Sequence, residues 1–193
     1  MFRSTRIRTF YACRVSFKAL LALSLLFASC AVAQTSSNNS GVLLTATLPE
    51  SITVVAAPSA VVFTLSPGTT SNGSSAVSIT TAWILGATRS SLKLYGSFNS
   101  ATAALTDGNG DNIPSANVLG QVTTGVPTSM TPFTQTAPFG SAGAGLELFS
   151  QGISPANLTG TRTDDLTLEI DLTNLAVPAG VYVGTLDIQA QAL

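Results

Sequence analysis

Residues 165–172 read Asp-Leu-Thr-Leu-Glu-Ile-Asp-Leu, an unbroken alternation of polar and large apolar side chains. Because successive side chains of a β-strand point to opposite faces, the leucine and isoleucine side chains share one face and the polar side chains share the other. One buried face and one wet face are typical of a strand in an antiparallel sheet. The stretch therefore predicts an antiparallel strand and indicates an all-β protein.

The same alternation recurs on both sides of this stretch, with turn-forming residues between the alternating segments. No segment shows a convincing 3.6-residue period, so no helix is expected. Strands are predicted over 44–48, 61–65, 77–85, 92–98, 146–148, 165–172 and 186–192, with one more near Phe133. Short strands at this spacing predict an immunoglobulin-like antiparallel β-sandwich of about 7–9 strands.

The first 33 residues have the three parts of a secretory signal peptide. A basic stretch without acidic residues, Met1–Lys18, is followed by the apolar run Ala19–Ala28 and then by Ala31-Val32-Ala33, with small residues at a cleavage site. The apolar run is about half of the ~20 residues that a membrane-spanning helix needs. We therefore expect cleavage after Ala33 and no retained transmembrane anchor. The expected location is secreted or at the cell surface, with the periplasm as the alternative.

Cys30 offers a second processing route. Residues 26–30, Leu-Phe-Ala-Ser-Cys, resemble a lipobox, in which the cysteine becomes the lipidated first residue. The position three before the cysteine is aliphatic in that pattern, and here it is Phe27. Cleavage after Ala33 is therefore the preferred prediction, and lipidation of Cys30 is the alternative.

The expected mature chain divides into a short leader and one domain. Residues 34–40 read Gln-Thr-Ser-Ser-Asn-Asn-Ser, which is polar and predicts a flexible leader. The alternating segments begin at Gly41, so residues 41–193 are expected to form a single β-sandwich domain.

The charge and residue types of the mature chain exclude several functions. Three basic residues against nine acidic ones give residues 34–193 a net charge of −6, which cannot neutralise a run of phosphates or an anionic membrane face. The chain has no histidine, and both cysteines, Cys13 and Cys30, lie in the expected signal peptide. A disulfide, a thiol nucleophile and an imidazole base are therefore absent from the expected mature chain. We expect a non-enzymatic protein that binds no nucleic acid and holds no cofactor.

The segment Asp107-Gly-Asn-Gly-Asp-Asn is a candidate calcium site. Asp107, Asn109 and Asp111 put oxygen side chains at positions one, three and five of a calcium-binding loop. The glycine of position six is replaced by Asn112, and the glutamate of position twelve is replaced by Val118. A hairpin turn is therefore the preferred interpretation, and calcium at these three residues is the alternative.

Acidic residues also gather around the alternating stretch. Asp164 and Asp165, with Glu169 and Asp171, have the residue types of a paired-carboxylate hydrolase site. Glu169 and Asp171 lie on the face opposite the leucines. We therefore interpret the four carboxylates as a solvated face of the sheet.

Four single residues have structural interpretations. Trp83 lies on the inward face of its predicted strand, which favours a core position over a glycan-binding platform. Tyr182 is expected to be packed or to lie at an edge. Lys93 and Arg162 have no phosphate-binding context and are interpreted as solubilising.

Residues 178–188 read Pro-Ala-Gly-Val-Tyr-Val-Gly-Thr-Leu-Asp-Ile and contain the pattern Gly-x-Tyr-x-x-Thr-apolar-x-apolar. This pattern resembles the last strand of secreted bacterial pilin-like and spore-coat-U-like domains. The match covers this strand only. The chain departs from these domains because its expected mature part has no cysteine and because it ends on Leu193 rather than after an aromatic residue.

The resemblance implies an edge-exposed sandwich that polymerises by strand addition between subunits. Gly41–Leu48 is then a candidate donor strand, although we prefer it as the first strand of its own sandwich. The function predicted from the sequence is an exported structural or adhesive cell-surface protein, and more specifically a fibre or pilus-like subunit. Its expected partners are further copies of the chain or another exported protein. The alternative function is a secreted module that binds a glycan or a protein.

Overall fold

The computed structural model describes residues 35–193, so the expected signal peptide, its cleavage site and Cys30 lie outside the described residues. The chain divides into one unit that ends at Ala46 and a second, compact unit over Thr47–Leu193. In the first unit, residues 35–46 contain no helix or strand, and each of them is exposed. The second unit contains all the strands found in residues 35–193.

Eleven strands and one 3-10 turn make up the regular structure of residues 35–193. They are β1 (Ser51–Ala57), β2 (Thr70–Asn72), β3 (Val77–Ile84), β4 (Ser91–Ser97), β5 (Leu105–Thr106), β6 (Asn112–Ile113), η1 (Ser115–Asn117), β7 (Val118–Val122), β8 (Thr131–Pro132), β9 (Gly145–Gly152), β10 (Thr159–Asp171) and β11 (Asp187–Ala192). All strand pairs are antiparallel, and the described part of the chain has no α-helix, which confirms the all-β prediction. The strand number exceeds the expected 7–9 because β2, β5, β6 and β8 have only two or three residues each.

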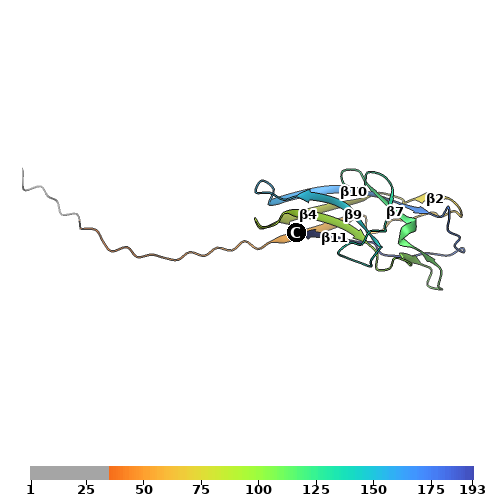
Figure 1. Cartoon of the computed structure of the whole chain (residues 1–193), viewed down its shortest axis with the longest axis horizontal. Helices are drawn as coiled ribbons and strands as arrows, with labels where there is room; N and C mark the ends of the chain where they lie inside the picture. Colours follow the sequence, from red (N-terminus) through yellow and green to blue (C-terminus); the bar gives the residue numbers. More distant parts are fainter. Residues whose placement is uncertain (1–34) are drawn as a thin grey trace, which may run out of the picture. The chain divides into compact units, whose positions relative to one another are not determined.

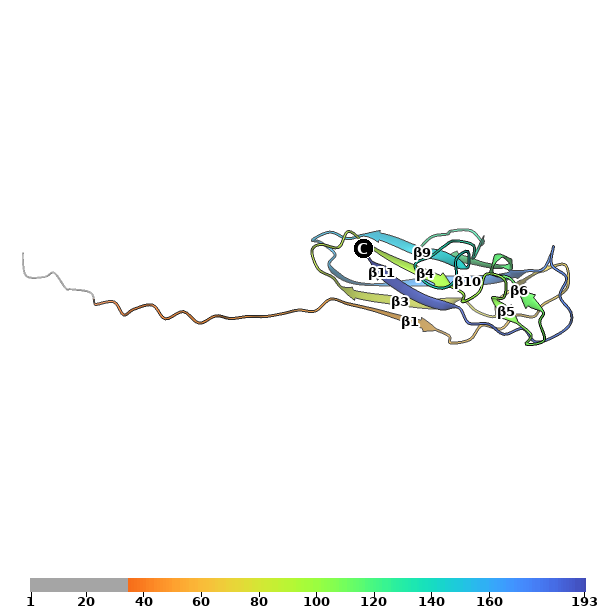
Figure 2. The same ribbon diagram turned by 60° about the horizontal axis from the view of Figure 1, so that its bottom comes forward.

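The strands form two main sheets. The first has the order β1-β3-β10-β7-β8, with β2 also paired to β10, and the second has the order β11-β4-β9. Strands β5 and β6 form a separate hairpin. Figure 1 shows β4 beside β9, and Figure 2 shows β1 beside β3.

The stretch 165–172 lies mainly in β10, the central strand of the first sheet. Leu166, Leu168 and Ile170 are buried, as their alternation predicts. Both sheets contribute to one hydrophobic cluster, so each sheet has a buried face. The largest side chains buried in it are Phe133, Phe149, Ile79, Leu92, Leu94, Ile113, Leu146, Leu148, Leu166, Ile170 and Val122.

Two strand predictions are wrong. Residues 44–48 form no strand, and residues 61–65 hold only an isolated bridge between Phe63 and Gly73. The first strand is instead β1, which pairs along the whole of β3 and directs Ile52 and Val54 toward the core. Since β10 occupies the other side of β3, neither edge of β3 is left for residues 44–48.

Candidate functional site

Two edge strands lie side by side where the sheets approach each other. β1 is the terminal strand of the first sheet and β11 is the terminal strand of the second, and the two are in contact without pairing. Figure 2 shows this neighbourhood. Each strand therefore keeps one row of backbone N–H and C=O groups that has no partner strand in residues 35–193.

The two edge strands run in opposite directions. The start of β1 pairs with the end of β3, through Ser51 and Ile84, and the end of β11 pairs with the start of β4, through Ala192 and Leu92. Because a short connection over 85–90 joins β3 to β4, the start of β1 and the end of β11 lie at the same end of the compact unit. We call this end the turn end.

Apolar side chains line the space between the edge strands and are incompletely covered. On β1 they are Ile52 and Val54, and on β11 they are Ile188, Ala190 and Ala192; all five pack against the core but stay partly exposed. On the central strands, by contrast, the core-facing side chains are fully buried. We call these five residues and the two free strand edges the seam.

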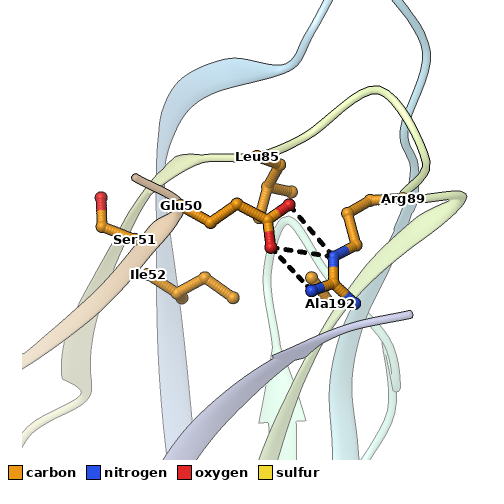
Figure 3. A pocket seen from close by; sticks show the side chains of 6 residues that line it. All are labelled: Glu50, Ser51, Ile52, Leu85, Arg89 and Ala192. Atoms are coloured by element: carbon orange, nitrogen blue, oxygen red, sulfur yellow. Dashed lines mark hydrogen bonds and ion pairs between the residues drawn. The ribbon is translucent and has the colours of Figure 1, made fainter. Parts of the chain in front are cut away.

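A pocket of about 250 Å³ opens at the turn end of the seam. Figure 3 shows its lining, in which the Glu50 and Arg89 side chains point toward each other among Ile52, Leu85 and Ala192. The pocket thus combines two seam residues, Ile52 and Ala192, with one ion pair.

The ion pair ties the start of β1 to the β3–β4 connection. The Arg89 guanidinium donates to the Glu50 carboxylate at 2.6 Å from Nη2 to Oε2, and the backbone N–H of Gly86 donates to Oε1 of the same carboxylate. These two donors, with the Arg89 hydrogen bonds as the larger cause, lower the pKa of Glu50 to about 2. A Cβ on residue 86 would lie 2.7 Å from Glu50 Oε1, so a glycine there lets the carboxylate approach the backbone.

The segment 41–48 carries large apolar side chains that are exposed. Val42, Leu43, Leu44 and Leu48 are 81%, 92%, 87% and 76% exposed. Their polar neighbours Thr45 and Thr47 leave a more apolar face formed by the even-numbered residues. Leaving side chains of this size in water is unfavourable, and burying each of them would contribute about 1.5–3 kcal/mol.

The candidate calcium residues form the tip of the β5–β6 hairpin. The Asp107 carboxylate accepts the backbone N–H of Asn109 at 2.8 Å and that of Asp111 at 3.0 Å, and these bonds lower the pKa of Asp107. This is the turn that the sequence favoured. Calcium binding at Asp107, Asn109 and Asp111 stays a prediction, which the melting temperature in calcium and in chelator would test.

The four carboxylates around β10 differ in their exposure to solvent. Asp164 is buried, and it accepts hydrogen bonds from Arg162 at 2.7 Å and from the Thr124 hydroxyl at 2.6 Å. Asp165 is exposed, whereas Glu169 and Asp171 are half-buried. The interpretation as a solvated face is therefore wrong for Asp164, because a cation two residues away on the same face of the strand compensates its burial.

The other four single residues each form a side-chain hydrogen bond or an ion pair. Trp83 is buried, as predicted, and its Nε1–H donates to the Asn157 carbonyl at 2.9 Å. Tyr182 is half-buried and donates to the Pro178 carbonyl. Lys93 and Arg162 are both ion-paired, Lys93 with Glu147 and Arg162 with Asp164, so their role is more than solubilising.

Of the two strands that form the seam, the sequence predicted β11 as the strand over 186–192 but missed β1. Ser51–Ala57 contains the alternating pair Ile52 and Val54, a signal that could have identified β1. The Glu50–Arg89 pair could not have been found, because the two residues are distant in the sequence and only the fold brings them together.

Comparison with known proteins adds no assignment, because no family model, curated protein or solved structure matches the chain. Across residues 35–193, no helix is long and apolar enough to span a membrane.

Proposed function

We propose that this chain is an exported, non-enzymatic structural protein of the cell surface, whose copies join into a fibre by strand addition. In this proposal the compact unit is an immunoglobulin-like β-sandwich, and segment 41–48 of one copy completes the seam of the next. The observation that carries it is that residues 35–193 hold both an exposed apolar segment and two free strand edges with partly exposed apolar side chains.

The sandwich assignment rests on the sheet arrangement. Two antiparallel sheets, β1-β3-β10-β7 and β11-β4-β9, bury their facing side chains in a common cluster. In a closed sandwich the edges are shielded by bulges, charges, proline or neighbouring segments. Here β1 carries no charged residue or proline, and β11 carries a single charge, Asp187, at its first position.

The unguarded edges make the seam an acceptor. An added strand would pair with the free backbone groups of β11 or β1 and would cover Ile188, Ala190 and Val54. Main-chain hydrogen bonds give such an interaction its affinity, and alternate side chains give it its specificity.

Segment 41–48 has the dimensions and the pattern of the missing strand. Its eight residues span about 27 Å when extended, against about 20 Å for the six residues of β11. Val42, Leu44, Ala46 and Leu48 present one apolar face to the seam, and the threonines face outward. One added strand thus removes Val42, Leu44 and Leu48 and the partly exposed seam side chains from water, whereas Leu43 faces outward with the threonines.

No observation favours the alternative of a glycan-binding module. Such a module presents exposed aromatic rings, but Trp83 is buried and Tyr182 is half-buried with its hydroxyl bonded to its own chain. Absence of histidine and cysteine from residues 35–193 supports a non-catalytic role for the part of the chain that the structure describes.

The test uses the full chain, expressed and recovered from the envelope and culture fractions. On a gel run without boiling, we expect a ladder of multiples that collapses to one band on boiling, because main-chain pairing in a buried strand dissociates slowly. Leu44→Asp with Leu48→Asp should abolish the ladder, whereas Thr45→Asp with Thr47→Asp, on the outward face, should keep it. A single monomer band for the unaltered protein in every lane would overturn the proposal.

A further inference from the structure

We infer that Asn109, at the tip of the β5–β6 hairpin, is a site of spontaneous covalent modification, in which the side-chain amide is lost and an aspartate or an isoaspartate takes its place. The inference is independent of the proposed strand addition. It rests on how differently the fold surrounds the two Asn-Gly pairs of the chain, Asn72-Gly73 and Asn109-Gly110.

The reaction belongs to an asparagine that is followed by a glycine. The backbone nitrogen of the glycine loses its proton and attacks the side-chain carbonyl carbon, Cγ, of the asparagine. The new N–Cγ bond closes a succinimide ring, while the Cγ–Nδ2 bond breaks and its nitrogen leaves as ammonia. Water then opens the ring at either carbonyl, which gives aspartate or isoaspartate. Glycine favours the attack because it has no Cβ to hinder the approach.

The surrounding fold decides whether the ring can close. The attacking N–H must be free of a strong hydrogen bond, and the asparagine backbone must rotate until Cγ meets the nitrogen. Pairing in a sheet prevents both, because the N–H donates to the neighbouring strand and the chain is fixed in its extended form. An Asn-Gly pair within a sheet therefore reacts only after local opening.

Asn72-Gly73 is protected in this way. Asn72 is the last residue of β2 and pairs with Glu169. The Gly73 N–H donates to the Leu168 carbonyl at 2.9 Å. A Cβ on residue 73 would lie 2.6 Å from Val61 Cγ1, so this glycine is also tightly packed. Ring closure at Asn72 must break the hydrogen bond and disturb the packing.

Asn109-Gly110 has neither protection. Both residues are exposed, and they connect β5 to β6, which pair at only two positions (Figure 2). A Cβ on residue 110 would meet no atom of a more distant residue within 4 Å, so nothing packs against the backbone there. Within residues 35–193, no backbone carbonyl accepts the Gly110 N–H.

The Asp107 carboxylate holds the neighbours of this nitrogen more firmly than the nitrogen itself. It accepts the Asn109 N–H at 2.8 Å and the Asp111 N–H at 3.0 Å. The Asn109 N–H is the largest cause of the lowered pKa of Asp107, and the Gly110 N–H is the smallest. The Asn109 side-chain amide also donates to Asp107, at 3.1 Å, on the exposed tip. Water replaces an exposed bond of this kind at little cost, so the side chain is free to turn toward Gly110.

The modification changes the hairpin tip in charge and in length. Either product adds a negative charge beside Asp107 and Asp111. Isoaspartate also adds a methylene to the main chain between these two residues, which are joined by a hydrogen bond from the Asp107 N–H to the Asp111 carbonyl at 3.1 Å. A calcium titration of this tip therefore needs protein whose residue 109 is known to be unmodified.

The test incubates the unaltered full chain, folded, at neutral and at mildly alkaline pH. Mass spectrometry of proteolytic fragments locates the mass gain from exchange of an amide NH2 for OH, and enzymatic methylation of isoaspartyl carboxylates marks the isoaspartate. We expect Asn109 to react at least about tenfold faster than Asn72, the factor that a local opening free energy of about 1.4 kcal/mol imposes on the paired site. The rate at Asn109 should rise with hydroxide concentration, because the attacking amide is deprotonated.

Unfolding the chain supplies the matched control. In urea, the two Asn-Gly pairs should react at similar rates, because the sheet no longer protects Asn72. In the folded protein, Asn109→Gln should remove the fast reaction, since the longer side chain closes a less favourable ring, and Asn72→Gln should leave that reaction unchanged.

Equal rates at Asn72 and Asn109 in the folded protein would overturn the inference. An Asn109 that stays intact in the folded protein but reacts in urea would overturn it as well, because the hairpin tip would then protect the amide.

Discussion

A buried carboxylate is the clearest residue-scale feature of the chain. Asp164 is 1% exposed on β10, and its two oxygens are shared between the Arg162 guanidinium and the Thr124 hydroxyl. The Arg162 guanidinium also lies 4.7 Å from the centre of the Phe149 ring, which fixes the cation over the aromatic face. Breaking a buried pair by removing one partner leaves a charge without compensation.

We therefore expect Asp164→Ala to destabilise the fold by about 3 kcal/mol, the lower end for a broken buried pair, because Arg162 keeps partial access to water. Asp165→Ala, at the exposed neighbouring position, should change stability by less than about 0.5 kcal/mol. Urea unfolding followed by tryptophan fluorescence of Trp83 measures both. Equal midpoints for the two variants would contradict the assignment of Asp164 as a structural residue.

Glu50 gives a pH dependence at the same scale. Its pKa is about 2 in the folded protein and 4.5 ordinarily, so folding favours the ionised form. The stabilisation by the ion pair is thus fully present above pH 4.5 and is lost as the pH falls from 4.5 toward 2. The difference in urea midpoint between the unaltered protein and Arg89→Ala should stay constant above pH 5 and shrink on acidification. A difference that grows on acidification would contradict the pairing.

At the scale of elements, periodicity predicted the strands with long alternating faces. β3, β4, β10 and β11 fall where alternation indicates strands, because each has one face in the core. β7 was missed because Gly120 interrupts its apolar pattern. A Cβ there would lie about 3 Å from the buried side chains of Leu146, Leu166 and Phe133, so the core itself requires the glycine.

The strand predicted over 44–48 shows what periodicity cannot tell. Alternation reports which side chains share a face, but it does not report which sheet edge is free to accept the strand. Residues 44–48 alternate well, yet β1 takes the edge of β3 that they would need. The pattern is equally suitable for a strand that pairs with another copy, and the sequence alone left that alternative open.

Gly160 on β10 lies so close to the Trp83 side chain of β3 that a larger residue does not fit there. It pairs with Trp83, and a Cβ at Gly160 would lie 2.5 Å from Trp83 Cζ2, while the indole is held by its bond to Asn157. Overpacking of this kind costs about 1–3 kcal/mol, so Gly160→Ala should lower the urea midpoint. Gly152→Ala, where a Cβ meets no atom within 4 Å, is the control and should leave the midpoint unchanged or higher. A neutral Gly160→Ala would contradict the packing of Trp83 against β10.

At the scale of the whole molecule, residues 35–193 carry both an exposed apolar segment, 41–48, and two terminal strands, β1 and β11, with partly exposed apolar side chains. In the proposed assembly, segment 41–48 of one copy covers the partly exposed seam side chains of another. The low charge of β1 and β11 agrees with this role, since charged residues are the usual protection of a sheet edge.

The central claim is that segment 41–48 of one copy fills the seam of another, and mixing two defective variants tests it most directly. Leu44→Asp with Leu48→Asp leaves a seam but no usable segment, and Ala190→Arg leaves a segment but blocks the seam. Neither variant alone should form multiples. An equimolar mixture should give one species with the mass of two copies. This species should contain both variants and should stay associated on a gel run without boiling. A mixture that stays monomeric, or a ladder from either variant alone, would contradict the account.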